Sequence, residues 1–167
     1  MVETIPMVNA SRYALNRVRA QSSWPELYDL LDQVTDPEVP VISIWELGVL
    51  QEVALVSEAV RVVITPTYSG CPAMGQIEMD ITSTLNQAGY ERVEIERRLS
   101  PAWTSDWLDS GARERLRQYG IAGPGHTACP QCGSTQTTPV SEFGSTACKA
   151  LYRCEACLEP FDYFKKF

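Results

Sequence analysis

Two Cys-x₂-Cys motifs near the C-terminal end constrain the fold of this chain more than any other feature. Cys129 and Cys132 form the first motif, Cys154 and Cys157 form the second, and 21 residues separate them. Each motif turns the backbone so that two thiolates can share one tetrahedral metal ion, an arrangement typical of structural zinc sites. About 40 residues bury too little apolar surface to fold alone, so the metal would supply folding free energy. The spacing predicts a closed Cys₄ zinc ribbon over residues 129–167.

The same four cysteines are compatible with two other chemistries. Two disulfides would form in an exported protein, but the first 20 residues contain no continuous apolar stretch that could serve as a signal-peptide core. We therefore expect reduced cysteines and a cytoplasmic protein. A rubredoxin-like Cys₄ iron site would carry single electrons, and the spacing does not distinguish iron from zinc. A closed site leaves no open coordination position, which favours docking on another protein over catalysis.

Two residues of this segment lie outside the Cys-x₂-Cys pattern. Cys148 precedes the second motif by six positions and belongs to neither pair. It is either a small buried hydrophobic residue, which we favour, or a spare thiol with a redox role. His126 is the only histidine and lies in a Gly/Pro-rich stretch. A histidine in such a linker is more often solvated than a metal ligand.

Charge is distributed unevenly along the 167 residues. The formal net charge is −7, and residues 24–85 contain ten acidic side chains but only one basic side chain, Arg61. A net-acidic chain binds nucleic acid poorly, because that interaction needs clustered Lys and Arg. No apolar run is long enough to cross a membrane. We therefore expect neither a nucleic acid nor a membrane as partner, but a protein with a basic docking face.

Apolar periodicity before the cysteine-rich segment predicts a small α/β domain. Apolar residues at helical spacing follow a capping box at Ser23 and end before Asp36. Alternating or continuous apolar runs further along the chain indicate three strands. The order α-β-β-α-β-α predicts helices covering a three- or four-stranded mixed sheet. The expected elements are a helix from Ser23 to before Asp36, a loop over 36–48, strands over 49–56 and 60–65, a helix over 72–88, a strand over 92–99 and a helix from Thr104 or Ser105 to Gly120. The expected domain limits are a flexible arm over 1–22, the α/β domain over 23–120, a linker over 121–128 and the ribbon over 129–167.

The loop from Thr65 to Pro72 joins a predicted strand to a predicted helix and contains Cys71. A cysteine in the first turn of a helix faces free N–H groups, which would lower its pKa. Thr65 and Thr67 offer hydroxyl groups beside it. The alternative is a small buried residue at a helix start. A cysteine hydrolase would need a histidine base, which this loop lacks, so the residues favour metal or sulfur handling.

The sequence Asp36-Pro37-Glu38-Val39-Pro40 forms a second distinctive loop. It places the carboxylates of Asp36 and Glu38 near a helix end, and two prolines stiffen it. It is either a solvated loop or, if the fold brings it to Cys71, part of a mixed oxygen and sulfur site for metal or cluster transfer.

These motifs together resemble the SufT-like iron–sulfur assembly domain family. The resemblance covers about residues 24–100 and rests on DPEVP with the following LGVL, and on ITPTYSGCPAM. The C-terminal part, from VEIERRLSPAWTSDW through the two Cys-x₂-Cys motifs to FDYFKKF, is similar to the PaaD-like family of bacterial phenylacetate degradation. This resemblance maps a reactive cysteine onto Cys71, an acidic motif onto Asp36 and Glu38, and places Cys148 in the family's FGST-x-CK stretch. It assigns the ribbon ligands to Cys129, Cys132, Cys154 and Cys157.

The resemblance implies a non-catalytic maturation factor. Such proteins accompany phenylacetyl-CoA 1,2-epoxidase, a di-iron monooxygenase with an iron–sulfur reductase subunit, and help to install its metal centres. The expected partners are the reductase or di-iron oxygenase subunits, and a homodimer is compatible with the sequence. The expected cofactor is Zn²⁺ in the ribbon, with iron or an iron–sulfur cluster bound transiently through Cys71. Two alternatives remain: a rubredoxin-like electron carrier and a structural subunit of the same oxygenase.

Overall fold

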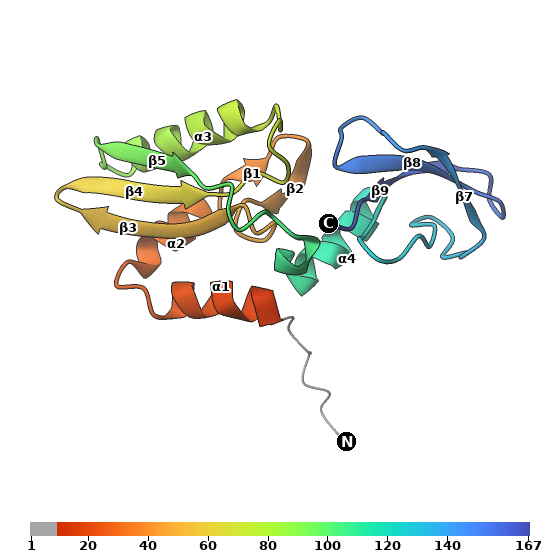
Figure 1. Cartoon of the computed structure of the whole chain (residues 1–167), viewed down its shortest axis with the longest axis horizontal. Helices are drawn as coiled ribbons and strands as arrows, with labels where there is room; N and C mark the ends of the chain where they lie inside the picture. The colour runs from red at the N-terminus through yellow and green to blue at the C-terminus, as the bar shows by residue number, and fades with distance from the viewer. Residues whose placement is uncertain (1–9) are drawn as a thin grey trace, which may run out of the picture.

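The computed structural model describes residues 10–167, and its first part is the expected mixed α/β domain (Figure 1). Strands β3 (Leu50–Val56), β4 (Ala59–Ile64) and β5 (Val93–Arg97) form a sheet in the order β3-β4-β5. Strands β3 and β4 are antiparallel, whereas β4 and β5 are parallel and are connected through helix α3 (Met74–Gln87). Helix α2 (Pro25–Leu31) completes the predicted order. We call residues 10–120 the main domain.

The core of the main domain lies between the sheet and its helices. Ile77, Ile81 and Leu85 recur at helical spacing on α3 and are fully buried. Alternate residues of β4, such as Val60 and Val62, belong to the same buried cluster. Burial of one stripe of α3 and one face of β4 follows from the periods of 3.6 and 2 in the sequence.

The N-terminal region differs from the flexible arm expected over residues 1–22. Residues 1–9 lie outside the described residues, but α1 (Ala10–Ala20) is a helix. Its Arg12 is 3% exposed and donates hydrogen bonds to the carbonyl oxygens of Trp45 (2.7 Å) and Trp107 (3.0 Å). The guanidinium also lies 4.5 Å from the centre of the Trp45 ring. A buried arginine anchors this helix, and apolar periodicity does not detect such a contact.

Three local predictions were wrong in detail. Ser23 does not cap α2: the N-cap is Trp24, with no capping side chain. The loop expected over 36–48 contains a small hairpin of β1 (Thr35–Asp36) and β2 (Val39–Ser43), because the Asp36 carboxylate holds a tight turn that strand periodicity does not predict. The helix expected from Thr104 or Ser105 is split into η1 (Ser105–Trp107) and α4 (Ser110–Tyr119), and each piece has its own cap, from Thr104 and Asp109.

The C-terminal part is a four-stranded sheet with the order β6-β9-β8-β7. Strands β7 (Thr137–Ser141), β8 (Lys149–Cys154) and β9 (Pro160–Phe164) are antiparallel neighbours. Strand β6 (Ile121–Ala122) lies in the segment expected to be a linker and pairs in parallel with β9. We call residues 121–167 the ribbon. Because β6 directly follows α4, the ribbon sheet begins where the main domain ends.

The ribbon packs directly on the main domain. Phe164 is 1% exposed and belongs, with Cys148, to the core cluster of the main domain. Its ring lies 5.9 Å from that of Trp103, and the Phe167 ring lies 6.0 Å from Trp103 on another side. The Phe167 carbonyl oxygen accepts a hydrogen bond from the Thr104 hydroxyl (2.9 Å), which fixes the C-terminus between the two parts (Figure 1).

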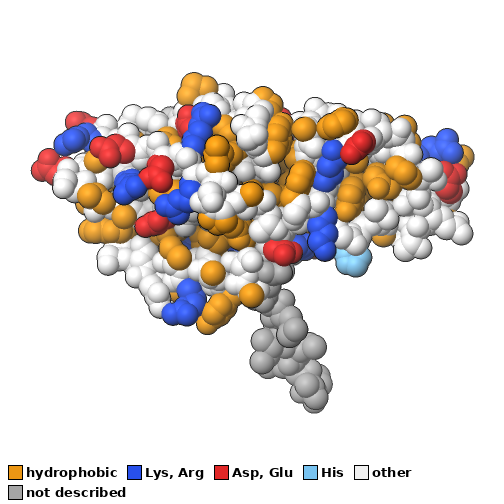
Figure 2. Space-filling model, viewed as in Figure 1, with side chains coloured by type: hydrophobic (Ala, Val, Ile, Leu, Met, Phe, Trp, Pro, Cys, Tyr) orange, Lys and Arg blue, Asp and Glu red, His pale blue; other side chains and the backbone are white. Residues whose placement is uncertain are grey.

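The surface of the main domain mixes both signs of charge, as Figure 2 shows around the end of the sheet. Arg97 pairs with Glu78 on α3, and Arg115 on α4 pairs with Glu46. The acidic block therefore has basic partners from residues later in the chain. No helix among residues 10–167 combines the length and the hydropathy needed to cross a membrane.

Candidate functional site

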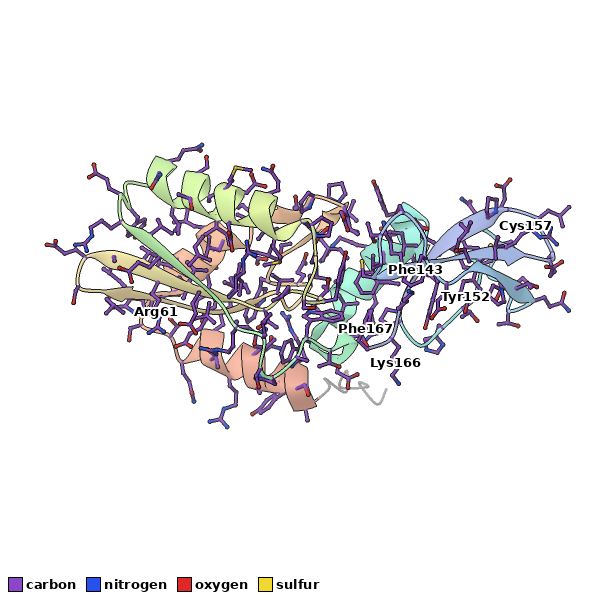
Figure 3. The ribbon with its side chains drawn as sticks, turned by 45° about the horizontal axis from the view of Figure 1, so that its top comes forward. Arg61, Phe143, Tyr152, Cys157, Lys166 and Phe167 are labelled. Carbon is purple, nitrogen blue, oxygen red and sulfur yellow. The ribbon has the colours of Figure 1, made fainter. Side chains whose placement is uncertain are left out.

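The four cysteines of the two motifs form one cluster in the ribbon. Their sulfur atoms all lie within 4.8 Å of one another, with 3.7 Å between Cys129 and Cys157 and 3.5 Å between Cys132 and Cys154. A tetrahedral ion with Zn–S bonds of about 2.3 Å places its ligands about 3.8 Å apart. The cluster therefore fits one tetrahedral metal ion. Figure 3 shows Cys157 at the end of the ribbon that points away from the main domain.

The backbone prepares this cluster for metal. The N–H groups of Cys157 and Ala156 donate hydrogen bonds to the Cys154 sulfur, and with the neighbouring thiols they lower the pKa of Cys154 to about 6. Gly133 follows the first motif with φ of +75°, a left-handed conformation that glycine adopts without strain. These hydrogen bonds favour the thiolate form of Cys154, which is the form that binds a metal ion.

Cys71 lies in a turn before α3, and not at its N-cap as expected. The helix begins at Met74 with Ala73 as N-cap, and the Cys71 N–H donates to the Tyr68 carbonyl oxygen (3.1 Å). The expected fall in the Cys71 pKa is wrong: burial raises the pKa of this half-buried thiol. Hydrogen bonds from the N–H of Ala73 and the hydroxyl of Thr67 lower the pKa by less. The thiol is therefore protonated at neutral pH.

The acidic loop lies beside Cys71. The negative charges of Asp36 and Glu38 both raise the Cys71 pKa, which shows that the carboxylates and the thiol are electrostatic neighbours. Asp36 is 7% exposed, and its Oδ1 accepts hydrogen bonds from the N–H groups of Glu38 (2.8 Å) and Val39 (3.0 Å). Burial raises the pKa of Asp36 despite these bonds. The structure thus brings the two loops together, with the sulfur facing negative charge.

The ribbon contributes a third segment to this place, residues 146–149. The Thr146 hydroxyl hydrogen-bonds the Glu38 carboxylate and lies 3.0 Å from the Cys148 sulfur. The Ala147 N–H donates to the Tyr68 hydroxyl oxygen, which joins the ribbon to the Cys71 loop. Asp36 and Glu38 act on the Cys148 thiol as they act on Cys71, and burial is the main reason that the Cys148 pKa is raised.

Lys149 is the buried cation of this segment. It is 4% exposed, and its Nζ lies 3.8 Å from the Asp162 carboxylate. Its positive charge also lowers the pKa of Asp36 and of Glu38, against the larger effect of burial. We call the set of Asp36, Glu38, Cys71, Thr146, Cys148 and Lys149 the junction site. Spacing alone did not connect Cys148 with Cys71; the FGST-x-CK resemblance was the signal that marked this segment.

Thr65 directly follows β4, the strand that leads to the Cys71 loop. It is 1% exposed, and its hydroxyl oxygen has no hydrogen-bond partner within the described part of the chain. A buried hydroxyl without a partner is unusual, because its desolvation is not compensated. Thr65 and Thr67 therefore differ: Thr67 already bonds Cys71, whereas Thr65 keeps an unused donor and acceptor.

The two sulfur sites are well separated. Cys148 directly precedes β8, and Cys154 is the last residue of that strand. Six residues of extended strand span about 20 Å. Within the described residues, the ligand atoms of the junction site do not gather as tightly as the Cys₄ cluster, whose members are the one group found within 4.8 Å. The ribbon metal and the junction site are therefore distinct sites.

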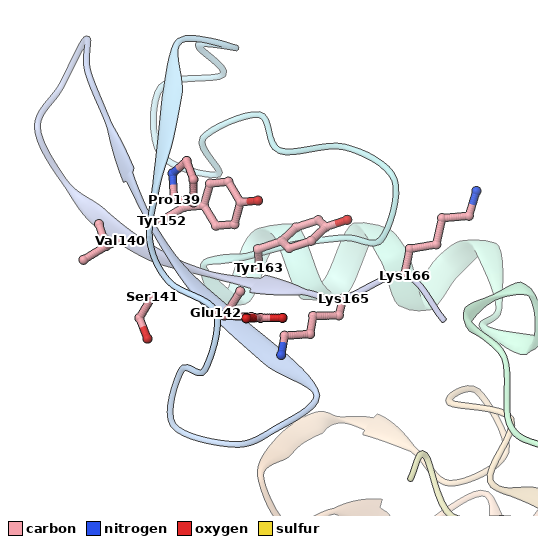
Figure 4. Close-up of a pocket in the computed structure, with 9 residues that line it drawn as sticks. Pro139, Val140, Ser141, Glu142, Tyr152, Tyr163, Lys165 and Lys166 are labelled. Carbon is pink, nitrogen blue, oxygen red and sulfur yellow. The ribbon is translucent and has the colours of Figure 1, made fainter.

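The ribbon also contains a groove, which none of the six cysteines lines. Figure 4 shows Tyr152, Tyr163, Lys165 and Glu142 around it, and its volume is about 420 Å³. Lys165 also lies 4.3 Å from the centre of the exposed Phe143 ring. His126 is exposed at the surface, as predicted, and is not a member of the Cys₄ cluster (Figure 2).

Comparison with known proteins identifies the family. Residues 117–165 match the model of the PaaD zinc beta ribbon domain, and residues 26–96 match that of the iron-sulfur cluster assembly protein. The chain is 49% identical over 150 residues to a putative 1,2-phenylacetyl-CoA epoxidase subunit of Escherichia coli (strain K12), covering 84% of this chain and 91% of that protein. The chain belongs to the PaaD family. The resemblance inferred from the motifs is thereby confirmed.

A solved structure supports the fold of the PaaD-family main domain. A domain of unknown function, DUF59, from Bacillus anthracis is 25% identical, with a TM-score of 0.51, and covers 62% of this chain and 95% of that chain. A conserved hypothetical protein from Thermotoga maritima is 25% identical with a TM-score of 0.48, over 57% of this chain and 94% of that chain. The predicted α/β class with a C-terminal Cys₄ ribbon is confirmed.

Proposed function

We propose that this PaaD-family protein is a cytoplasmic, non-catalytic assembly factor that delivers iron or an iron–sulfur species to a phenylacetyl-CoA epoxidase complex. The observation that supports the proposal is that the negative charges of Asp36 and Glu38 in the acidic loop both act on the Cys71 thiol. Thiolate and carboxylate ligands together suit iron, which accepts both soft and hard donors. The iron is cargo here, and the match to an iron-sulfur cluster assembly model and the name of the relative from Escherichia coli support this role.

The parts of the protein would then divide the work. Cys71 would hold the cargo, and Asp36 and Glu38 would supply oxygen ligands, with the hydroxyls of Thr65 and Thr67 beside them. The Cys₄ cluster would hold Zn²⁺ as a permanent ion that stabilises the ribbon, because four thiolates leave no position open for exchange. The ribbon groove would contact a reductase or di-iron oxygenase subunit through acidic and apolar side chains that complement Lys165 and its aromatic neighbours, and not through the basic face expected from the net charge of the chain.

An experiment in cells tests whether Cys71 is needed for the transfer of iron to the epoxidase. The Cys71→Ser variant replaces the chromosomal copy, and the epoxidase is then isolated and analysed for iron content and activity. We expect both to fall while the variant accumulates normally and retains its zinc. The matched control is Ser69→Ala, which alters an exposed hydroxyl of the same loop. Unchanged iron occupancy and activity in the Cys71→Ser strain would show that Cys71 does not transfer iron.

A second function, a structural component of the oxygenase, is favoured by the relative's description as an epoxidase subunit. It predicts that the chain co-purifies with the oxygenase at fixed stoichiometry and that Cys71→Ser leaves the assembled complex fully active. A rubredoxin-like carrier would instead be red and redox-active when purified without oxygen. Colourless protein with one zinc ion per chain would exclude that carrier.

A further inference from the structure

The fold gives Cys148 a place that neither its spacing nor the family descriptions assign. It is 5% exposed and lies in the ribbon, yet it belongs to the buried cluster of the main domain. Cys71 packs against the same cluster. The two thiols are separated by 77 positions in the chain. Ala147, which directly precedes Cys148, donates its N–H to the Tyr68 hydroxyl of the Cys71 loop, so the docking of the ribbon places a second free thiol near that loop.

The two thiols share their polar neighbours. Asp36 and Glu38 exert their charge on both, and the Tyr68 hydroxyl is affected by both sulfurs. The Thr146 hydroxyl connects the Cys148 sulfur, 3.0 Å away, to the Glu38 carboxylate. A hydroxyl has one proton to donate, so the thiol can donate to Thr146 while Thr146 donates to Glu38. These hydrogen bonds thus connect the ribbon with the main domain.

The charges around the two thiols suit a cation. Two carboxylates face them, and the one buried cation of the segment, Lys149, is already paired with Asp162 at 3.8 Å. Thr65, at the start of the Cys71 loop, adds a buried hydroxyl without a partner.

We propose that Cys148 is a second thiol ligand for the cargo iron, so that the transfer site is built from both modules. This inference rests on the proposed function of Cys71. Binding one Fe²⁺ through both sulfurs forms two Fe–S bonds and releases the two thiol protons to solvent, with no change in oxidation state. The ribbon would then be part of the binding site.

Cobalt titration of the zinc-loaded full chain tests the proposal. Co²⁺ bound to thiolates absorbs in the near ultraviolet, and the absorbance per bound ion rises with the number of thiolates. We expect wild type to bind one Co²⁺ without losing zinc. Cys148→Ser and Cys148→Ala should each halve the absorbance per bound ion and weaken binding at least about tenfold, as should Cys71→Ser. Glu91→Gln, which removes an exposed carboxylate of the main domain, is the control and should bind as wild type does.

The outcomes separate this inference from the proposed function. If Cys71→Ser loses the cobalt band and both Cys148 variants keep it at full intensity, Cys71 binds metal alone and the inference is wrong. If zinc-loaded wild type binds no Co²⁺, both proposals are wrong. Bridging of the thiols by dibromobimane in wild type provides a measurement that needs no variant to fold. We expect a linked pair of peptides containing Cys71 and Cys148, and separate labelling of the two cysteines would contradict the inference.

Discussion

The two sulfur sites of this protein differ in almost every physical respect. The Cys₄ cluster comes from two short motifs of one module, and its sulfurs already lie at the spacing of a tetrahedral ion. The junction site comes from three segments of two modules and combines thiols with carboxylates around a buried lysine. A complete set of soft ligands holds a metal permanently, whereas a mixed and looser set can release it. The comparison suggests one site for stability and one for transfer.

Loss of the metal ion from the Cys₄ cluster should have the largest effect on stability. Structural zinc contributes apparent binding free energies of about 10–16 kcal/mol at neutral pH, most of it coupled to folding. Cys154→Ser, or a chelator on wild type, should therefore unfold the ribbon, which hydrogen exchange would detect as lost protection of β8 and β9. Cys71→Ser should leave that protection intact. Retained protection in metal-free Cys154→Ser would mean that the ribbon folds without its ion.

Loss of the packing contact between the ribbon and the main domain should have the next largest effect on stability. Phe164 is fully buried in the main core, and truncation of such a phenylalanine costs about 3–5 kcal/mol. Phe164→Ala should lower the midpoint of thermal unfolding and speed the alkylation of Cys148, while the Cys₄ site keeps its zinc. Phe143→Ala is the control, because this ring is 64% exposed. If Phe164→Ala leaves Cys148 as slow to react as in wild type, the ribbon does not depend on this contact for its position.

The ionised Asp36 carboxylate should lower the free energy of unfolding at neutral pH, because it is buried in the junction site. Burial raises its pKa above the ordinary value of 3.8, so the fold favours the neutral acid. Its contribution to stability is therefore greatest at low pH and is lost as the pH rises through the folded pKa. Asp36→Asn retains an oxygen for the N–H groups of Glu38 and Val39 and removes the charge.

We expect Asp36→Asn to be more stable than wild type at pH 7, with a smaller loss of stability between acidic and neutral pH, and to bind iron more weakly. Urea unfolding at several pH values measures the first effect. Glu58→Gln removes an exposed carboxylate in the β3–β4 turn and serves as the control. A variant less stable than wild type at pH 7 would show that the ionised carboxylate stabilises the fold.

Removal of the Thr146 hydroxyl, which connects Glu38 with Cys148, should have the smallest effect and should be seen in metal affinity. Thr146→Val keeps the shape of the side chain and removes its hydrogen bonds to Glu38 and Cys148, which are worth about 0.5–1.5 kcal/mol each. The variant should bind Co²⁺ a few-fold more weakly with the same number of thiolates, as read from the absorbance per ion. Thr138→Val, on an exposed position of β7, is the control. Wild-type affinity in Thr146→Val would remove this hydroxyl from the account.

The contrast also explains what could be predicted from the sequence. The Cys₄ cluster depends on spacing within motifs, and the sheet and α3 depend on apolar periods, so both were accessible to local patterns. The Cys71 pKa was predicted in the wrong direction, because the local pattern showed a helix start but not the burial and the charges around the sulfur. Thr146 hydrogen-bonds Glu38 across 108 positions of sequence, and Arg12 hydrogen-bonds Trp107 across 95. Contacts at such separation leave no local periodicity.

The most direct test of two distinct metal sites is X-ray absorption at the zinc and iron edges of one anaerobic sample loaded with both ions. We predict four sulfur neighbours around zinc and a mixture of sulfur and oxygen neighbours around iron, with one ion of each per chain. In Cys71→Ser the iron should be lost while the zinc spectrum stays the same. Iron surrounded by four sulfurs, with a matching loss of zinc, would place iron in the ribbon and contradict the account.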